Sequence, residues 1–108
     1  MIRQQIKAEI LIPIYYNDKT SVEDEKLTAT YDDIEARFGG CTLDETPLIG
    51  GWIDPDTKIH YEDQNITYWV LCDGTDGNIE FFRNLKDTLK KRFKQQEILM
   101  YYLYVYRL

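Results

Sequence analysis

The sequence predicts a single α+β domain, in which an open antiparallel sheet carries two helices on one face. Its 108 residues are the usual length of one domain, and a content of 44% hydrophobic and 30% charged residues is typical of a folded globular chain. Apolar residues alternate in some segments and recur every three or four residues in others. Read in order, these periodicities predict strand, helix, strand, strand, helix and strand.

The first strand and helix have clear local signals. Between residues 6 and 14, isoleucine and alanine alternate with other side chains, which predicts a strand that ends before the break at residues 17–19. Residues 21–24 (Ser-Val-Glu-Asp) resemble a capping box, so we expect the first helix to begin there. Gly39 or Gly40 supplies its left-handed stop. The apolar stripe of this helix comprises Leu27, Tyr31, Ile34 and Phe38.

The middle of the chain reads as an irregular hairpin. Pro47 and the glycine pair at 50–51 predict a bulged strand over residues 41–53, with its apolar part at 48–53. Residues 54–57 (Asp-Pro-Asp-Thr) predict a tight turn. The partner strand is expected over residues 58–72, polar in its first half and apolar on both faces in its second.

The last two elements complete the fold. A loop at residues 73–77 precedes the second helix, for which Thr75 or Asp76 is the expected cap, and the last strand is expected over residues 98–106. Two βαβ halves joined by a hairpin predict a ferredoxin-like sandwich over residues 1–108, with strand order 4-1-3-2 and both helices on one face. The apolar stripe of the second helix comprises Ile79, Phe82, Leu85, Leu89 and Phe93.

Charge and hydropathy disfavour several partners. The net charge of −6 disfavours binding to a nucleic-acid backbone. A basic group does lie near the end of the second helix, where the helix dipole accounts for it. No apolar stretch is long enough to span a membrane, and the first residues lack the apolar core of a signal peptide, so we expect a cytoplasmic protein. The basic group comprises Lys86, Lys90, Lys91, Arg92 and Lys94.

The sheet face that the helices leave bare is expected to be apolar. Both alternating sets of the last strand carry aromatic or large aliphatic residues, whichever set faces the helices. Three interpretations stay open. In the first, the tyrosines are simply half-exposed to water; in the second, the sheets of two copies pair face to face or edge to edge in a homodimer; in the third, a ligand or single-stranded nucleic acid stacks on the aromatic rings. The homodimer is favoured, and a protein partner is also compatible. The interface candidates are Leu11, Trp69, Met100, Tyr102, Tyr104 and Tyr106.

Polar and sulfur-bearing residues suggest little chemistry. His60 and Glu62 share a strand face and could act as a base or as half of a metal site, although a solvated hairpin tip explains them better. With one histidine and no binding motif, we expect no metal and no cofactor, and we assign no catalytic residue. Cys41 and Cys72 stand nearly symmetrically about the turn, and two separate buried thiols are favoured over a redox pair.

From Arg37 onwards, over about two-thirds of its length, the chain resembles a family of small uncharacterised bacterial proteins. The motifs that carry the resemblance are R-F-x-x-x-T, G-x-W-x-D, an acidic residue in the next strand, and K-x-x-F; they fall here on Arg37-Phe38, Thr42, Gly50/Gly51-Trp52-x-Asp54, Glu62, and Lys90 with Phe93. The resemblance implies a fold and no reaction. Family members begin with an export or lipoprotein signal that this chain lacks, so their location is not carried over.

The recurring residues of that family suggest a cluster. They imply that Arg37, Trp52, Asp54 and Glu62 lie together, with an arginine–carboxylate pair bracing the hairpin. With His60 added, these residues are the candidate ligand-binding set.

Two functions therefore remain open. The first is a non-enzymatic domain that homodimerises, or binds a protein, through the aromatic face of its sheet. The alternative is a small-molecule enzyme or binder of the dimeric α/β-barrel type, in which His60, Glu62 or a tyrosine would handle protons. Fold alone does not decide between an enzyme and a binding domain.

Overall fold

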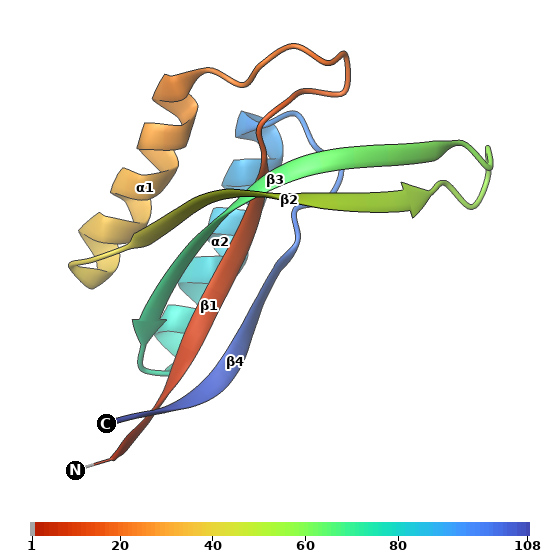
Figure 1. Ribbon diagram of the computed structural model, residues 1–108. Coiled ribbons are helices and arrows are strands. Elements are labelled where there is room, and N and C mark those ends of the chain that lie inside the picture. Colours follow the sequence, from red (N-terminus) through yellow and green to blue (C-terminus); the bar gives the residue numbers. More distant parts are fainter. Residues whose placement is uncertain (1) are drawn as a thin grey trace.

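The computed structural model describes residues 2–108 and contains the six elements in the expected order. Its four strands form one antiparallel sheet of order β2-β3-β1-β4, which is the predicted order 4-1-3-2 read from the other edge. The strand order and the α+β class are thus confirmed (Figure 1). The elements are β1 (Arg3–Pro13), α1 (Asp24–Phe38), β2 (Thr42–Ile53), β3 (His60–Cys72), α2 (Asp76–Arg92) and β4 (Met100–Arg107).

The core lies between one face of the sheet and the two helices. Alternate residues of β1 and β3 point to that face, where Ile34 of α1 and Leu89 of α2 are fully buried. Tyr68 of β3 is also fully buried, and its hydroxyl donates to the Leu27 carbonyl oxygen of α1 at 2.8 Å. Arg92 of α2 joins the helices directly, through a 2.8 Å bond to a carboxylate oxygen of Asp33.

Two of the three predicted helix boundaries follow local chemistry. Gly39 ends α1 in the left-handed conformation, with φ of 76°, and the Thr75 hydroxyl caps α2 by accepting the Asn78 N–H at 3.2 Å. The predicted capping box of α1 is wrong. The helix begins after Glu23, which makes no side-chain cap, because Ser21 pairs with Tyr15 in an isolated bridge as the chain returns from β1.

The β2–β3 hairpin leaves the body of the protein. The two strands shift register between Asp44 and Leu48, as the bulge prediction required, and Pro47 lies within the shift. Pairing of β1 with β3 ends at Asn65, so beyond that residue the sheet has only two strands. We call residues 48–65 the hairpin arm; it projects from the sheet in Figure 1.

The tip of the arm is a compact turn, as predicted for residues 54–57. One carboxylate oxygen of Asp54 accepts the backbone N–H groups of Asp56 at 2.8 Å and Thr57 at 3.0 Å. Lys58 then adopts a left-handed φ of 64° before β3 begins.

Within residues 2–108, no helix combines the length and the apolar character needed to cross a membrane.

Candidate interaction surface

Strand β4 is an edge strand with apolar side chains on both faces. It pairs only with β1, and the side chains of Tyr104 and Tyr106 are 67% and 69% exposed. The rings of Tyr102 and Tyr104 lie next to each other, with centroids 5.8 Å apart. A strand of this composition is normally covered by other elements. The large exposed side chains of β4 are Tyr101, Tyr102, Leu103, Tyr104 and Tyr106.

The free edge of β4 can be assigned from the ladder with β1. The Leu11 N–H donates to the Leu99 carbonyl oxygen at 3.0 Å, which marks these two residues as a hydrogen-bonded pair. Because hydrogen-bonded and non-hydrogen-bonded pairs alternate along an antiparallel ladder, Tyr101 and Leu103 also direct their backbone groups to β1. The other alternating set of β4 directs its backbone N–H and C=O groups to the outer edge of the sheet; this set is Met100, Tyr102, Tyr104 and Tyr106.

The opposite edge of the sheet is protected. Strand β2 carries Asp44, Glu45, Pro47 and the register shift, all features that discourage pairing with another chain. Strand β4 has no proline, no register shift and one charged residue, Arg107, at its end. The two edges therefore differ in their capacity to accept a further strand.

The open face of the sheet has a polar centre in an apolar frame. Glu9 of β1 lies between Trp69 and Tyr101, and Lys7 pairs with it at 3.3 Å while lying 4.5 Å from the Trp69 ring centroid. The hydrogen bond from Tyr101 lowers the pKa of Glu9, with Lys7 adding to the effect. The surrounding side chains on this face are Leu11, Leu71, Leu103 and Val105.

The predicted interface residues do not share one face. Leu11 and Trp69 lie on the open face. Ala8, a core residue, is the cross-strand partner of Tyr102, so Met100 and all three even-numbered tyrosines of β4 point to the helix side of the sheet. Grouping them with Leu11 and Trp69 was therefore wrong. Both sets of β4 are apolar, so no pattern in the sequence distinguishes its two faces.

The candidate ligand-binding residues are also divided. Trp52, Asp54, His60 and Glu62 lie on the hairpin arm, whereas Arg37 lies at the end of α1. There Arg37 donates to the Asn78 side chain at 3.2 Å and lies over the Phe81 ring. The expectation that it joins the arm residues is wrong, because motif spacing along the chain does not report which elements pack together.

Within the arm, the strand alternation separates these side chains further. Trp52 stacks on Tyr61 with ring centroids 4.7 Å apart, on the open side of the sheet. His60 and Glu62 lie on the opposite side, as their shared parity predicted. The His60 ring passes close to Gly51, where an added Cβ would meet its Nε2 at 3.2 Å.

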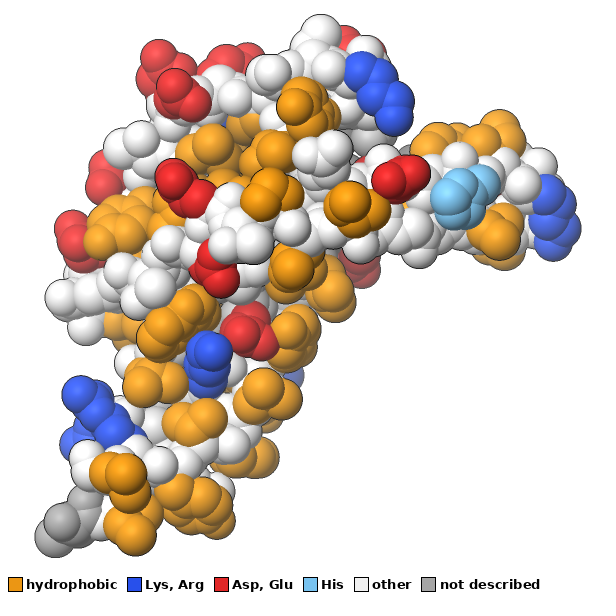
Figure 2. All heavy atoms as spheres, in the orientation of Figure 1, with side chains coloured by type: hydrophobic (Ala, Val, Ile, Leu, Met, Phe, Trp, Pro, Cys, Tyr) orange, Lys and Arg blue, Asp and Glu red, His pale blue; other side chains and the backbone are white. Residues whose placement is uncertain are grey.

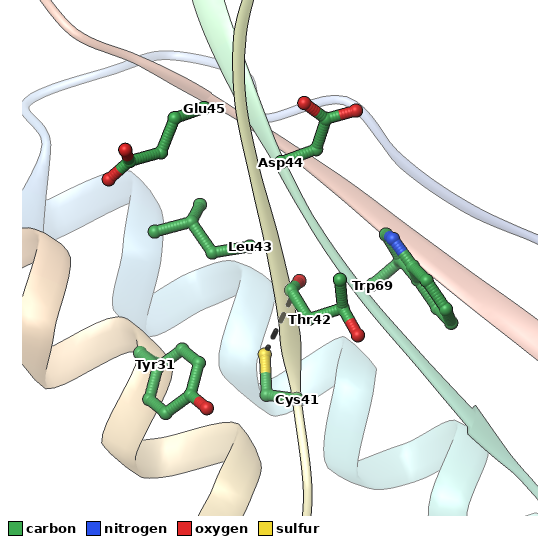
Figure 3. Close-up of a pocket in the computed structure, with 7 residues that line it drawn as sticks. All are labelled: Tyr31, Cys41, Thr42, Leu43, Asp44, Glu45 and Trp69. Carbon is green, nitrogen blue, oxygen red and sulfur yellow. Dashed lines mark hydrogen bonds between the residues drawn. The ribbon is translucent and has the colours of Figure 1, made fainter.

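One surface hollow, with a volume of about 740 Å³, lies where β2 begins. Figure 3 shows that β2 runs through it, with Leu43 and Glu45 on one side of the strand and Asp44 and Trp69 on the other. The polar groups do not converge on one point. The full lining is Tyr31, Cys41, Thr42, Leu43, Asp44, Glu45 and Trp69.

A second hollow, of about 320 Å³, lies where the hairpin arm meets the loop after β1. It combines phenol rings with carboxylates, which suits a ligand that has an aromatic ring and hydrogen-bond donors. Glu62 of the candidate set belongs to it, whereas Trp52 and His60 do not. Its lining residues are Tyr15, Tyr16, Asn17, Lys19, Tyr61, Glu62, Asp63 and Gln64.

The two cysteines are free thiols. Burial raises the pKa of Cys41 to about 11 and also raises that of Cys72, so both are protonated at neutral pH. In the described part of the chain, no three His, Cys, Asp or Glu side chains are grouped so that they could hold a metal ion.

Comparison with known proteins gives a likeness of fold. No family model matches the chain, and no curated protein matches it. Among solved structures, the chain is similar to a phage SAM lyase in complex with S-methyl-5'-thioadenosine, with a TM-score of 0.70 and 11% sequence identity. The match covers 95% of this chain and 88% of the lyase chain. At this identity the likeness shows a shared fold.

Proposed function

We propose that the protein is a ferredoxin-like, non-enzymatic self-association domain that forms a homodimer through the outer edge of β4. The observation that carries the proposal is the unprotected apolar edge of β4, with outward backbone groups at Met100, Tyr102, Tyr104 and Tyr106. Such an edge is a template for another strand, and an identical strand related by a two-fold axis is the simplest complement.

One antiparallel register uses all four outward-facing residues. It places Met100 opposite the second copy's Tyr106, and Tyr102 opposite the second copy's Tyr104. Aromatic cross-strand pairs of this kind stabilise antiparallel sheets. The result is a continuous eight-stranded sheet in which the tyrosines of β4, exposed in the monomer, lie at the centre.

The test is a proline at position 104, where the N–H points away from β1. Tyr104→Pro removes an outward donor and leaves the β1 ladder intact, so we expect a folded monomer. Tyr104→Thr keeps the donor and is the matched control, expected to keep dimers with weaker affinity. Sedimentation velocity from 1 to about 100 µM, with circular dichroism as a check of folding, separates them. A wild-type monomer throughout this range, or an unaffected Tyr104→Pro dimer, would contradict the proposal.

A second candidate function is binding of an adenosine-bearing small molecule. It is favoured by the similarity of fold to a lyase solved with S-methyl-5'-thioadenosine, together with the aromatic and acidic hollow beside Tyr61 and Glu62. The phenol rings would stack on the base, and the carboxylates would accept hydrogen bonds from the ribose hydroxyls.

Calorimetric titration with S-methyl-5'-thioadenosine and with SAM tests this candidate. Binding that is lost in Tyr61→Ala and retained in Tyr106→Ala would support the hollow as the site. Absence of heat with both ligands at millimolar concentration would remove this function.

A further inference from the structure

We infer that the hairpin arm is an intersubunit clasp, which reaches across the β4 contact and binds the Arg3–Arg107 end of a second copy of this chain. The inference rests on the proposed β4–β4 pairing, because that pairing sets which end of the second copy the arm meets.

The arm is apolar on both of its faces. Ile49 and Ile53 are 71% and 61% exposed on one side, and Trp52 with Tyr61 is partly exposed on the other. Figure 2 shows the orange side chains along the projecting arm. An isolated two-stranded ribbon is marginally stable in water, so side chains of this kind on a projecting ribbon indicate a surface that packs against something.

The sheet register identifies what that surface meets. The arm leaves the sheet at Asn65, opposite Pro13, and Met100 pairs with Ile10 near the same end of β1. The base of the arm and the start of β4 therefore lie at one end of the sheet. In an antiparallel pairing of two β4 strands, the start of one strand lies beside the end of the other. The arm thus emerges at the end of the sheet where the second copy places its Arg107 and the β1 partner of that residue, Arg3.

The charges of these two regions are complementary. The arm carries Asp54, Asp56, Glu62 and Asp63 against one cation, Lys58. Arg3 and Arg107 are cross-strand partners, and the nearest carboxylate to Arg3, Asp73, lies at 4.0 Å. An acidic arm that docks on this arginine pair brings opposite charges together, and the two-fold axis of the dimer generates two such contacts.

The length of the arm fits this contact. Six residues in each strand beyond the register shift extend about 20 Å. From β3, the second copy's β1 lies four strand spacings away, which is about 19 Å. Two arms about 10 Å wide would add on the order of 800 Å² of buried surface, which brings the assembly towards the roughly 1,600 Å² of a standard stable interface.

Charge reversal tests the clasp. The arm variant Asp56→Lys/Glu62→Lys, which leaves the Asp54 turn intact, is expected to raise the dimer Kd about tenfold, and combining it with Arg3→Glu/Arg107→Glu is expected to restore it. The variant Asp32→Lys/Glu35→Lys changes the net charge equally on the exposed surface of α1 and is the matched control. Sedimentation equilibrium at low salt gives each Kd, and circular dichroism verifies folding.

A proximity measurement provides an independent readout. In a Cys41→Ser background, an equimolar mixture of Asp56→Cys and Arg3→Cys copies should be joined by a short bis-maleimide. A mixture of Glu25→Cys and Arg3→Cys copies should not be joined. A dimer whose Kd is indifferent to arm charge and whose arm does not cross-link overturns the clasp and leaves the β4 contact in place. A wild-type chain that stays monomeric overturns both.

Discussion

Strand β3 passes through two environments, and the contrast between its halves separates the body of the protein from its arm. Tyr68, in the body half, is fully buried and hydrogen-bonded to Leu27 of α1. Tyr61, seven residues earlier, is 39% exposed and has Trp52 as its stacking partner. The side chains are identical and the strand is continuous. What differs is that a helix and a third strand cover one half and not the other.

The body therefore stabilises itself, while the arm has little beyond its own cross-strand contacts. Burial of apolar surface contributes about 25 cal/mol per Å², and this contribution is concentrated where α1, α2 and β1 meet β3. We expect the arm to open at lower free energy than the body in the monomer, and to be protected when a second copy covers it.

The largest expected effect contrasts Leu89 with Ile53. Leu89→Ala creates a cavity at a fully buried position and should lower the free energy of unfolding by about 2–5 kcal/mol. Ile53→Ala, in the exposed arm, should change it by about 0.5 kcal/mol or less at concentrations where the chain is monomeric. Urea denaturation measures both values. Comparable losses in the two variants would contradict the division into body and arm.

A smaller effect is expected from removing one hydroxyl at each tyrosine of β3. Tyr68→Phe leaves the Leu27 carbonyl without its 2.8 Å donor and should cost about 1 kcal/mol. Tyr61→Phe keeps the stacking on Trp52 and should be nearly neutral in monomer stability. The same denaturation measurement applies, and equal effects would show that the Tyr68 hydrogen bond adds nothing to the body.

The smallest effect concerns the acid stability of the tip. Backbone N–H groups of Thr57 and Asp56 bind the Asp54 carboxylate and lower its pKa. The native pKa lies below the unfolded one, so the carboxylate stabilises the turn above about pH 3.9, and this contribution is lost as the pH falls through the native value. NMR titration of Asp54 should give a midpoint below about 3.9. Asp54→Asn keeps an acceptor oxygen and removes the titrating group, so the Thr57 amide should lose the titration step whose midpoint matches that of Asp54.

Local chemistry explains which features could be predicted from the sequence. Gly39, Thr75 and the turn at residues 54–57 act within a few residues of themselves, so their effects are visible in the chain. The strand order followed because few connections are compatible with two βαβ halves.

Features that depend on distant contacts could not be predicted in this way. The position of Arg37 depends on how α1 packs against α2, where Asn78 and Phe81 bind it. Which side chains of β4 face the helices depends on the register of β4 with β1. Both alternating sets of β4 side chains are apolar, so the sequence does not indicate which set faces inward. The projection of the arm follows from where β1 stops pairing with β3, at Pro13 opposite Asn65. The proline is a local signal for the end of β1, but it does not indicate which part of β3 extends beyond that end.

The register shift at the base of the arm determines which insertions and deletions β2 can tolerate there. Residues 45–47 of β2 lie opposite residue 66 of β3, so β2 has two more residues than β3 in this segment. Because the excess is an even number, the side chains of β2 alternate between the two faces in the same phase before the shift and from Leu48 onwards. Pairs of residues could be gained or lost here without exchanging the two sides of the ribbon. A single insertion would turn every later β2 side chain over, and with it Trp52 would leave Tyr61.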